Sequence, residues 1–365
     1  MAVYIARIEK GIRGSLDKVI RHFLKPADLD RGVLIKPNIV FPVTDRGMEI
    51  TRRAVVEQVV LILRAMKRDA DIVIGEGVAA GADARENFRV SGYADLCRDL
   101  GVPLVDLETA ERTDVEWKYG RISLPSIALT RLYISLPILK LNSAAGISGA
   151  MKNQKGLVSA AMKKQFHRMG LHEPLAELNN VIQPHLSIVD CARHFTGPLF
   201  LAGLGTAELD SYIVNLLGIA PPENIRLARA GAPPPVVLGD TPFRPRSSYK
   251  NLYRPFKRFL RLRIWSGAGA CSLCRRRLTE MKSPGLPFRR FGLTTAIKLA
   301  ALMAGGGDII VGSEQRQVQG AKRIICFGEC AKKALGGECD DCIPGCPPSF
   351  ENLAFYLGRK GKRPA

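Results

Sequence analysis

Cysteines are crowded toward the end of this sequence. Seven of the nine lie beyond position 270: Cys271, Cys274, Cys326, Cys330, Cys339, Cys342 and Cys346. The first residues lack the unbroken apolar run of a secretory signal, so we expect reduced thiols. Crowded thiols in a reducing compartment favour a metal or catalytic role over disulfides.

The spacing favours an iron–sulfur cluster, with zinc as the alternative. Cys339-x2-Cys342-x3-Cys346-Pro matches the bacterial ferredoxin run from its second cysteine onward. Four thiolates suit zinc equally well, and only an all-cysteine zinc site fits because no histidine lies beyond His194. Proline after the last cysteine and glycines before several others favour a cluster, whose sulfurs accept backbone N–H bonds.

The elements that must position such chemistry are read from the apolar pattern. Short β-rich runs occur at 32–40, 70–77, 102–108, 132–142 and 186–193. Between the first two, apolar residues recur at helical spacing. This alternation predicts an α/β fold with a mainly parallel sheet flanked by helices, and a smaller cysteine-rich α+β region at the C-terminal end.

Polar residues stand where such a sheet binds its ligands, beyond the carboxyl ends of the strands. The segment GISGAMKNQKG follows an apolar strand, and its small residues let backbone N–H groups approach an oxyanion. It contains neither a Walker loop nor a G-x-G-x-x-G fingerprint. We expect an anionic small molecule to bind at Lys36, Asn38, Ser148, Gly149, Lys152 and Asn153. A tight turn with solvated lysines is the alternative.

Lys140 is the first candidate for proton transfer. It follows mostly apolar residues in LPILKLN, so partial desolvation would suit it to act as an acid or base. The alternative is a strand-end lysine that reaches water. Asp190 and Asp210 also have a structural alternative, which is to cap a helix or pair with an arginine.

Five blocks resemble, in order, the family called domain of unknown function 362. They are LIKPNIV, IGEG, KLNSAAGISGAMKNQKGLV, SIVDCARHFTGP and AELDSYIVNLLG, within residues 30–220. The Gly-x-Ser-Gly-Ala-x-Lys-Asn block is the most specific. The resemblance implies a domain often joined to iron–sulfur modules and connected with redox work, without naming a reaction. A family-like histidine after that block makes His167 the second candidate proton donor, with a solvated surface histidine as the alternative.

The resemblance also implies a ligand set for the metal. A C-x2-C far upstream of a G-x-C and a GCPP would make Cys271, Cys274, Cys330 and Cys346 the ligands of one 4Fe–4S cluster. Three cysteines are then left over. Cys326, Cys339 and Cys342 would build a second centre or replace one of the four.

A strongly basic segment needs its own explanation. Of a net charge of +20, residues 241–290 contribute fourteen Lys or Arg against one acidic residue, Glu280. Aromatic residues interleave with the arginines in YKNLYRPFKRFLRLRIW. The interpretation we favour is a structural connector. An amphipathic helix with Phe256, Leu260 and Ile264 on one face would instead bind an acidic redox partner or a membrane surface. Nucleic acid is the third alternative, although no RNA-binding module is recognisable.

The organisation that follows is an α/β domain over 1–240, a basic aromatic connector over 241–265 and a cysteine-rich metal region over 266–365. The 365 residues are 46% hydrophobic, enough for a substantial core. No apolar stretch is long enough to span a bilayer, so we expect a cytoplasmic protein without a transmembrane segment.

Two functions are consistent with these features. The first is a 4Fe–4S protein, with one cluster or two, that acts as an oxidoreductase or electron-transfer component on an anionic small molecule and meets a redox partner with an acidic surface. The second is a non-catalytic metal-binding protein with a structural or redox-sensing centre. In that alternative the basic segment binds RNA or an acidic partner. The lack of a His/Asp ligand set argues against a metal hydrolase.

Overall fold

The computed structural model describes residues 1–9, 11–47, 49–79, 82–142, 146–246, 256–259, 262–266, 307–311, 324–328, 331–332, 335 and 339–344. The chain divides into two compact units. The first comprises Met1–Phe166 and His172–Leu252, and the second comprises His167–Leu171 and Tyr253–Ala365.

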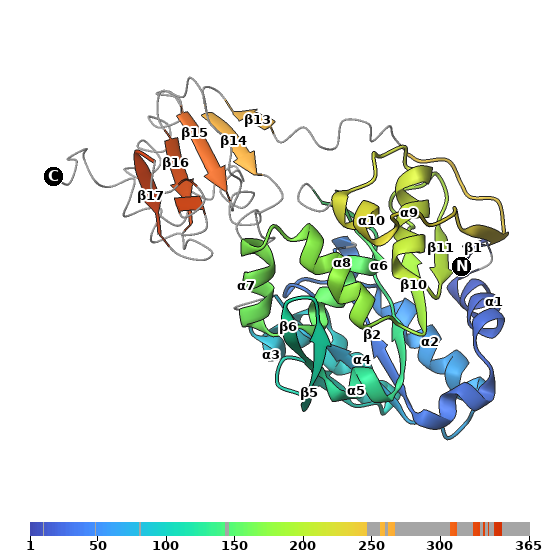
Figure 1. Cartoon of the computed structure of the whole chain (residues 1–365). Helices are drawn as coiled ribbons and strands as arrows, with labels where there is room; N and C mark the ends of the chain where they lie inside the picture. The colour runs from blue at the N-terminus through green and yellow to red at the C-terminus, as the bar shows by residue number, and fades with distance from the viewer. Residues whose placement is uncertain are drawn as a thin grey trace. The chain divides into compact units, whose positions relative to one another are not determined.

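An eight-stranded sheet forms the centre of the first unit (Figure 1). Its order is β12 (Val236–Gly239), β1 (Ala2–Arg7), β11 (Leu199–Gly203), β10 (Leu186–Asp190), β7 (Leu132–Ser135), β2 (Val33–Lys36), β3 (Ile72–Glu76) and β4 (Leu104–Asp106). All neighbouring pairs are parallel except those of β11, which is antiparallel to both β1 and β10. The predicted α/β class with a mainly parallel sheet is confirmed.

Helices cover both faces of this sheet. One core contains residues of α1 (Ile12–Phe23), α2 (Arg53–Met66), α3 (Ala84–Ser91) and α4 (Tyr93–Leu100). The other contains residues of α6 (Ala150–Asn153), α8 (His172–Val181), α9 (Thr206–Leu216) and α10 (Glu223–Ala228). Strand β11 shows why both faces are covered. Phe200 and Ala202 pack in the first core, and Leu199 and Leu201 pack in the second. Successive side chains of a strand point to opposite faces, so a fully apolar strand must be covered on both.

The predicted strand over 132–142 is divided in two. Its first part is β7, whereas β8 (Lys140–Asn142) leaves the large sheet and pairs with β9 (Gly146–Ser148) as an antiparallel ribbon. Pro137 lies between them and has no N–H to donate to a ladder. A second ribbon joins β5 (Arg112–Trp117) to β6 (Gly120–Pro125), followed by α5 (Ser126–Thr130). Short 3-10 helices lie at Pro26–Arg31, Asp45–Gly47 and Gln154–Leu157, and α7 spans Ala160–Arg168.

The second unit contains a five-stranded sheet. Its order is β13 (Phe256–Phe259), β14 (Leu262–Ser266), β15 (Gly307–Val311), β16 (Ile324–Phe327) and β17 (Asp341–Ile343). Strands β14 to β17 are parallel, and β13 is antiparallel to β14. The alternative of an amphipathic helix through Phe256 and Ile264 is therefore wrong. Apolar and charged residues alternate over Leu262, Arg263 and Ile264, which is the pattern of a strand. The apolar residues at i and i+4 had suggested a helix instead.

The basic segment begins on the first unit. The Arg7 guanidinium lies 4.4 Å from the centre of the Phe243 ring. The backbone N–H of Thr196 donates to Arg244 O at 2.8 Å, and that of Arg246 donates to His194 O at 2.9 Å. Residues 241–246 thus belong to the first unit, whereas 256–259 and 262–266 are strands of the second sheet.

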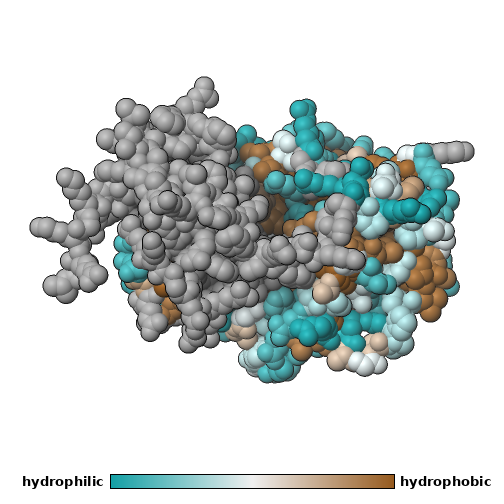
Figure 2. Space-filling view, turned by 90° about the horizontal axis from the view of Figure 1, so that it is seen from above, coloured by the Kyte–Doolittle hydropathy of each residue, from teal (hydrophilic) through white to brown (hydrophobic). Residues whose placement is uncertain are grey.

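The surface of the described part is mixed, with apolar areas among hydrophilic ones (Figure 2). Met1, Val236 and Val237 are exposed apolar residues at the β12 edge of the large sheet, and Leu204, directly after β11, is exposed as well. No helix among the described residues is long and apolar enough to cross a membrane.

Candidate functional site

A buried ion pair lies at the carboxyl ends of β2 and β3. Lys36 is completely buried, and its Nζ lies 2.7 Å from Glu76 Oε1. The Glu76 carboxylate also accepts the backbone N–H groups of Ile39 and Gly77, each at 2.9 Å. Burial lowers the pKa of Lys36, while the Glu76 charge and hydrogen bond oppose that change. This pair places a cation and an anion where parallel sheets bind ligands.

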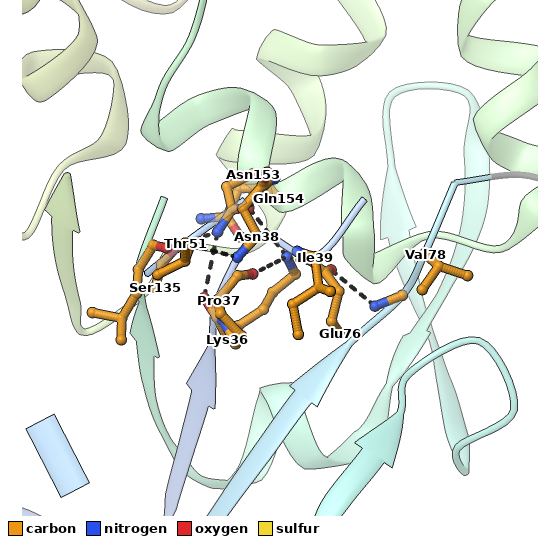
Figure 3. Close-up of polar contacts among 12 residues, drawn as sticks. Lys36, Pro37, Asn38, Ile39, Thr51, Glu76, Val78, Ser135, Asn153 and Gln154 are labelled. Atoms are coloured by element: carbon orange, nitrogen blue, oxygen red, sulfur yellow. Dashed lines mark hydrogen bonds and ion pairs between the residues drawn. The ribbon is translucent and has the colours of Figure 1, made fainter. Parts of the chain in front are cut away.

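Asn153 connects this pair to neighbouring elements (Figure 3). Its Oδ1 accepts from Lys36 Nζ at 3.3 Å and from Asn38 Nδ2 at 3.1 Å. Its Nδ2 donates to Ser135 Oγ at 2.9 Å. One amide therefore holds together the ends of β2 and β7 and the last turn of α6. The sequence-predicted residues Lys36, Asn38 and Asn153 do meet in space.

Lys140 approaches the same cluster from β8 and remains partly exposed. Its Nζ donates to Asn38 Oδ1 at 2.7 Å and to Glu49 O at 2.9 Å. Burial lowers the pKa of Lys140 to about 8, with Lys36 adding to the effect and the charges of Glu76 and Glu49 opposing it. The desolvation expected from the sequence is thus present. Lys140 therefore gives the cluster a partly exposed amine with a pKa of about 8.

Two glycines let the segments around this cluster come together. A Cβ on Gly77 would lie 2.1 Å from Gly156 O, which is backbone. A Cβ on Gly156 would lie 2.3 Å from Glu76 Oε1 and 2.6 Å from Lys36 Nζ. None of these three distances is tolerable for a carbon atom, so the approach of the two segments requires glycine at both positions.

A second buried lysine was not foreseen as part of the site. Lys163 Nζ on α7 donates to Val78 O at 2.9 Å, Gly77 O at 3.3 Å and Glu108 Oε2 at 3.1 Å. A signal existed in the sequence, because Lys163 precedes the buried Phe166 by three residues and so shares its helix face. His167 follows Lys163 by one turn, in the last turn of α7.

Gln154 was also not foreseen. It is fully buried and accepts from the hydroxyl of Tyr133 at 2.6 Å. Its Nε2 has no hydrogen-bond partner among the described residues. A buried amide donor without an acceptor is unusual in a folded protein.

The backbone N–H groups at the start of α6 already bind a carboxyl group of the same chain. The Asp210 carboxylate of α9 accepts the backbone N–H groups of Ala150 at 2.7 Å and Met151 at 3.0 Å. A Cβ on Gly149 would lie 2.1 Å from Asp210 Oδ1. Burial raises the pKa of Asp210 to about 7, although the two N–H bonds act in the opposite direction. The structural role considered for Asp210 is confirmed, and two backbone donors at the start of α6 are occupied internally.

Asp190 also has a structural role. Its carboxylate lies 2.6 Å from Arg52 Nε and accepts the backbone N–H of Ala192 at 3.1 Å. Ser148 is the register partner of Lys140 in the β8–β9 ribbon. Binding of an external anion at Ser148, Gly149 or Lys152 stays a prediction.

The raised pKa of Asp210 predicts a dependence of stability on pH. The folded state binds this proton more tightly than the unfolded state does, so stability is greatest at low pH and is lost as pH rises toward 7. We expect a loss of about 2 kcal/mol between pH 5 and pH 7 from this group. Urea unfolding of the wild type and of Asp210→Asn at both values measures it. The neutral variant should lack this part of the slope, and equal slopes in both proteins would contradict the assignment.

Three thiols of the second unit lie close together. Cys326 on β16 is completely buried, pairs in register with Cys342 on β17, and packs against both Cys339 and Cys342. Burial raises the pKa of Cys326, and a hydrogen bond with Cys339 adds to it. Among the residues that the structure describes, no group of three or more His, Cys, Asp or Glu is arranged to hold a metal ion. The predicted ligands Cys271, Cys274, Cys330 and Cys346 lie outside the described residues.

Part of the chain is similar to a known family. Residues 33–203 match the family described as Domain of unknown function (DUF362), which confirms the resemblance for that segment. No curated protein matches the chain. Among solved structures, the chain is similar to the lactate racemase apoprotein from Thermoanaerobacterium thermosaccharolyticum, with 15% identity and a TM-score of 0.38. The similarity covers 56% of this chain and 54% of that one, so the chain spans about half the length of that protein.

Proposed function

We propose that this protein is an iron–sulfur protein that exchanges electrons with an anionic small molecule bound at the cluster of Lys36, Asn38, Lys140 and Asn153. The observation that carries the proposal is the convergence of these residues at the carboxyl ends of the strands. This is the edge at which open α/β sheets bind ligands.

The arrangement favours an anion over a neutral ligand. Lys140 presents an amine at a partly exposed position, and Asn38 holds it by a hydrogen bond of 2.7 Å. Behind it lies Lys36, whose charge is compensated by Glu76. An ammonium group held in a partly desolvated place attracts a carboxylate or phosphate more strongly than one in water does.

Lys140 is also the residue that we propose moves a proton. A group whose pKa lies near the working pH can both accept and release a proton, and the pKa of Lys140 is lowered to about 8. Lys36 is completely buried and paired with Glu76, so it is not placed to exchange a proton with a ligand. His167, on α7, remains the second candidate.

Electron transfer would come from the cysteine-rich region. Thiolates are the donors that iron–sulfur clusters take, and we assign Cys271, Cys274, Cys330 and Cys346 to one 4Fe–4S cluster, which supplies single electrons when bound. Cys326, Cys339 and Cys342 are then available for a second centre. Zinc on the same thiolates is the alternative, and it would make the region a structural or sensing centre.

Metal analysis of anaerobically purified protein tests this proposal. About four irons and four sulfides per chain, with a spectrum that changes on dithionite addition, are expected for one cluster, and about eight for two. Replacing Cys271 and Cys274 together by serine should remove the iron. Cys97→Ala, at a buried cysteine of α4 in the first unit, is the matched control and should retain it. Stoichiometric zinc without iron would contradict the redox function.

A further inference from the structure

Three thiols of the second unit have no role in the single 4Fe–4S cluster proposed above. Cys326, Cys339 and Cys342 form what we term the thiol triad. Cys326 is completely buried, whereas Cys339 and Cys342 are partly exposed and pack against it. Ala331 and Leu335 belong to the same small core. Cys326 therefore lies in apolar surroundings with two further cysteine side chains beside it.

The backbone brings the two partly exposed cysteines to Cys326 in different ways. Cys342 is the register partner of Cys326 in the β16–β17 pair. Cys339 precedes β17, so it is outside the ladder. The residue after it is tied to the start of β16, because the backbone N–H of Ile324 donates to Asp340 Oδ2 at 2.7 Å. Cys339 thus approaches Cys326 from the segment that leads into β17.

This difference decides which pair can form a disulfide. Register partners on neighbouring strands are separated by about one strand spacing, about 4.8 Å. A disulfide needs its two Cβ atoms about 3.5–4.5 Å apart, so the ladder holds Cys326 and Cys342 too far apart for a bond. The Cys339 thiol is not held by the ladder, and a hydrogen bond joins it to the thiol of Cys326. The sulfurs of Cys326 and Cys339 are therefore already neighbours.

We propose that Cys326 and Cys339 are a redox-active dithiol pair that closes to a disulfide by exchange with a small-molecule disulfide such as glutathione disulfide. The inference goes beyond the proposed function and does not depend on an iron–sulfur cluster elsewhere in the chain. A second metal centre on the thiol triad is the competing use of the same sulfurs, and the experiment below separates the two.

The exposure of the two cysteines sets the order of the reaction. Cys339 is partly exposed, so its thiolate attacks one sulfur of glutathione disulfide. A bond forms between Cys339 and that sulfur, the S–S bond of glutathione disulfide breaks, and one glutathione leaves as a thiolate. Cys326 is enclosed and meets only its neighbours. Its thiolate then attacks the Cys339 sulfur, and the second glutathione leaves.

The exchange balances in electrons and protons. The two cysteines together lose two electrons, and glutathione disulfide gains them and becomes two thiols. The two protons released by the cysteine thiols are taken up by the two glutathione thiolates. Reduced glutathione in excess reverses both steps, so the pair would follow the ratio of disulfide to thiol around the protein.

A thiol–disulfide titration of the full-length, anaerobically purified protein tests the inference. The protein is equilibrated with glutathione buffers of rising disulfide fraction, and the remaining thiols are blocked with N-ethylmaleimide. Trypsin cleaves after Lys332 and endoproteinase Asp-N cleaves before Asp340, so the three cysteines of the triad lie in separate peptides. Mass spectrometry without reduction identifies the linked peptides, and fragment ions assign the bonded sulfur in each. Iron is quantified in the same samples.

We expect a disulfide between Cys326 and Cys339, with the iron content unchanged. Cys339→Ser should abolish this bond. Cys342→Ser, at the other partly exposed cysteine of the triad, is the matched control and should retain it. Cys97, a buried cysteine of the first unit, should remain a thiol, since it would react only if the protein unfolded. The wild-type peptide map gives the pairing even if a variant fails to fold.

Two results would overturn the inference. The first is a wild-type protein in which Cys326 stays a thiol at the highest disulfide fraction or bonds to Cys342 instead. The second is loss of iron in step with oxidation of the thiol triad, which would show that these sulfurs bind a metal. A protein with zinc and no iron that still forms the Cys326–Cys339 bond would contradict the proposed function and support this inference.

Discussion

Glu76→Gln is expected to lower the free energy of unfolding by about 3–5 kcal/mol, because it leaves Lys36 without its countercharge in the protein interior. Lys36 is completely buried. The Glu76 carboxylate also accepts from Ile39 N and Gly77 N, one on each oxygen. The amide nitrogen of a glutamine would therefore face a donor in either orientation. Urea unfolding at pH 7, with metal content verified before each titration, measures the loss.

The pH dependence of this variant gives an independent check. Without Glu76, burial lowers the pKa of Lys36 still further, so the unfolded state binds the proton more tightly than the folded state. Stability of the variant should therefore recover as the pH rises from 6 to 9. Lys118→Met is the matched control, since it breaks the exposed Lys118–Glu173 pair, which solvent screens, and should change stability far less. A similar small loss in Glu76→Gln would show that the buried pair does not stabilise the site.

Gly77→Ala should destabilise the protein by about 3 kcal/mol or more, the upper end of the cost of overpacking. Its Cβ would lie 2.1 Å from Gly156 O, and backbone cannot turn aside as a side chain can. The end of β3 and the segment at Gly156 would have to separate. That movement would disturb the bonds of Lys163 to Gly77 O and of Lys36 to Glu76. The change in unfolding free energy is the measurement, with thermal unfolding if expression is low.

Gly14→Ala is the control for this substitution. Gly14 lies inside α1, and a Cβ there would meet no atom within 4 Å. Alanine is favoured over glycine in a helix by about 0.5–1 kcal/mol, so this variant should be more stable than the wild type. If Gly77→Ala were tolerated as well as Gly14→Ala, the close approach of Gly77 and Gly156 would not be a feature of the folded protein.

The α/β class could be predicted from the sequence because hydrophobic runs of strand length recur with helical patterns between them. The runs at 32–40, 70–77 and 186–193 contain β2, β3 and β10. Strands β1 and β11 were not predicted. Strand β11 pairs antiparallel with both neighbours. Antiparallel strands need no crossover helix between them, so the alternation of strand and helix patterns did not indicate β11. The run at 132–142 was divided because its second part pairs with β9 instead of continuing in the sheet.

Part of the candidate site could also be predicted from the sequence. A polar residue at the end of a buried strand is placed at the ligand-binding edge by the strand itself, as Lys36 and Asn38 are at the end of β2. Lys140 reaches them from β8, outside the large sheet, through its hydrogen bond to Asn38. The partners of other residues were not readable. Lys163 pairs with Glu108, 55 residues earlier, and Asp210 binds a backbone segment 60 residues earlier. No local pattern connects such residues.

The sequence by itself determined the period of its strands and helices, the positions of its strand-end lysines and the crowding of its cysteines, because each depends on neighbouring residues. Only the tertiary structure decided which lysines are enclosed with three oxygen acceptors each, as Lys36 and Lys163 are. It also placed Asp210 on the backbone donors at the start of α6 and brought Gly77 against Gly156. These outcomes depend on contacts between distant segments, whose burial sets both the charge states and the space available.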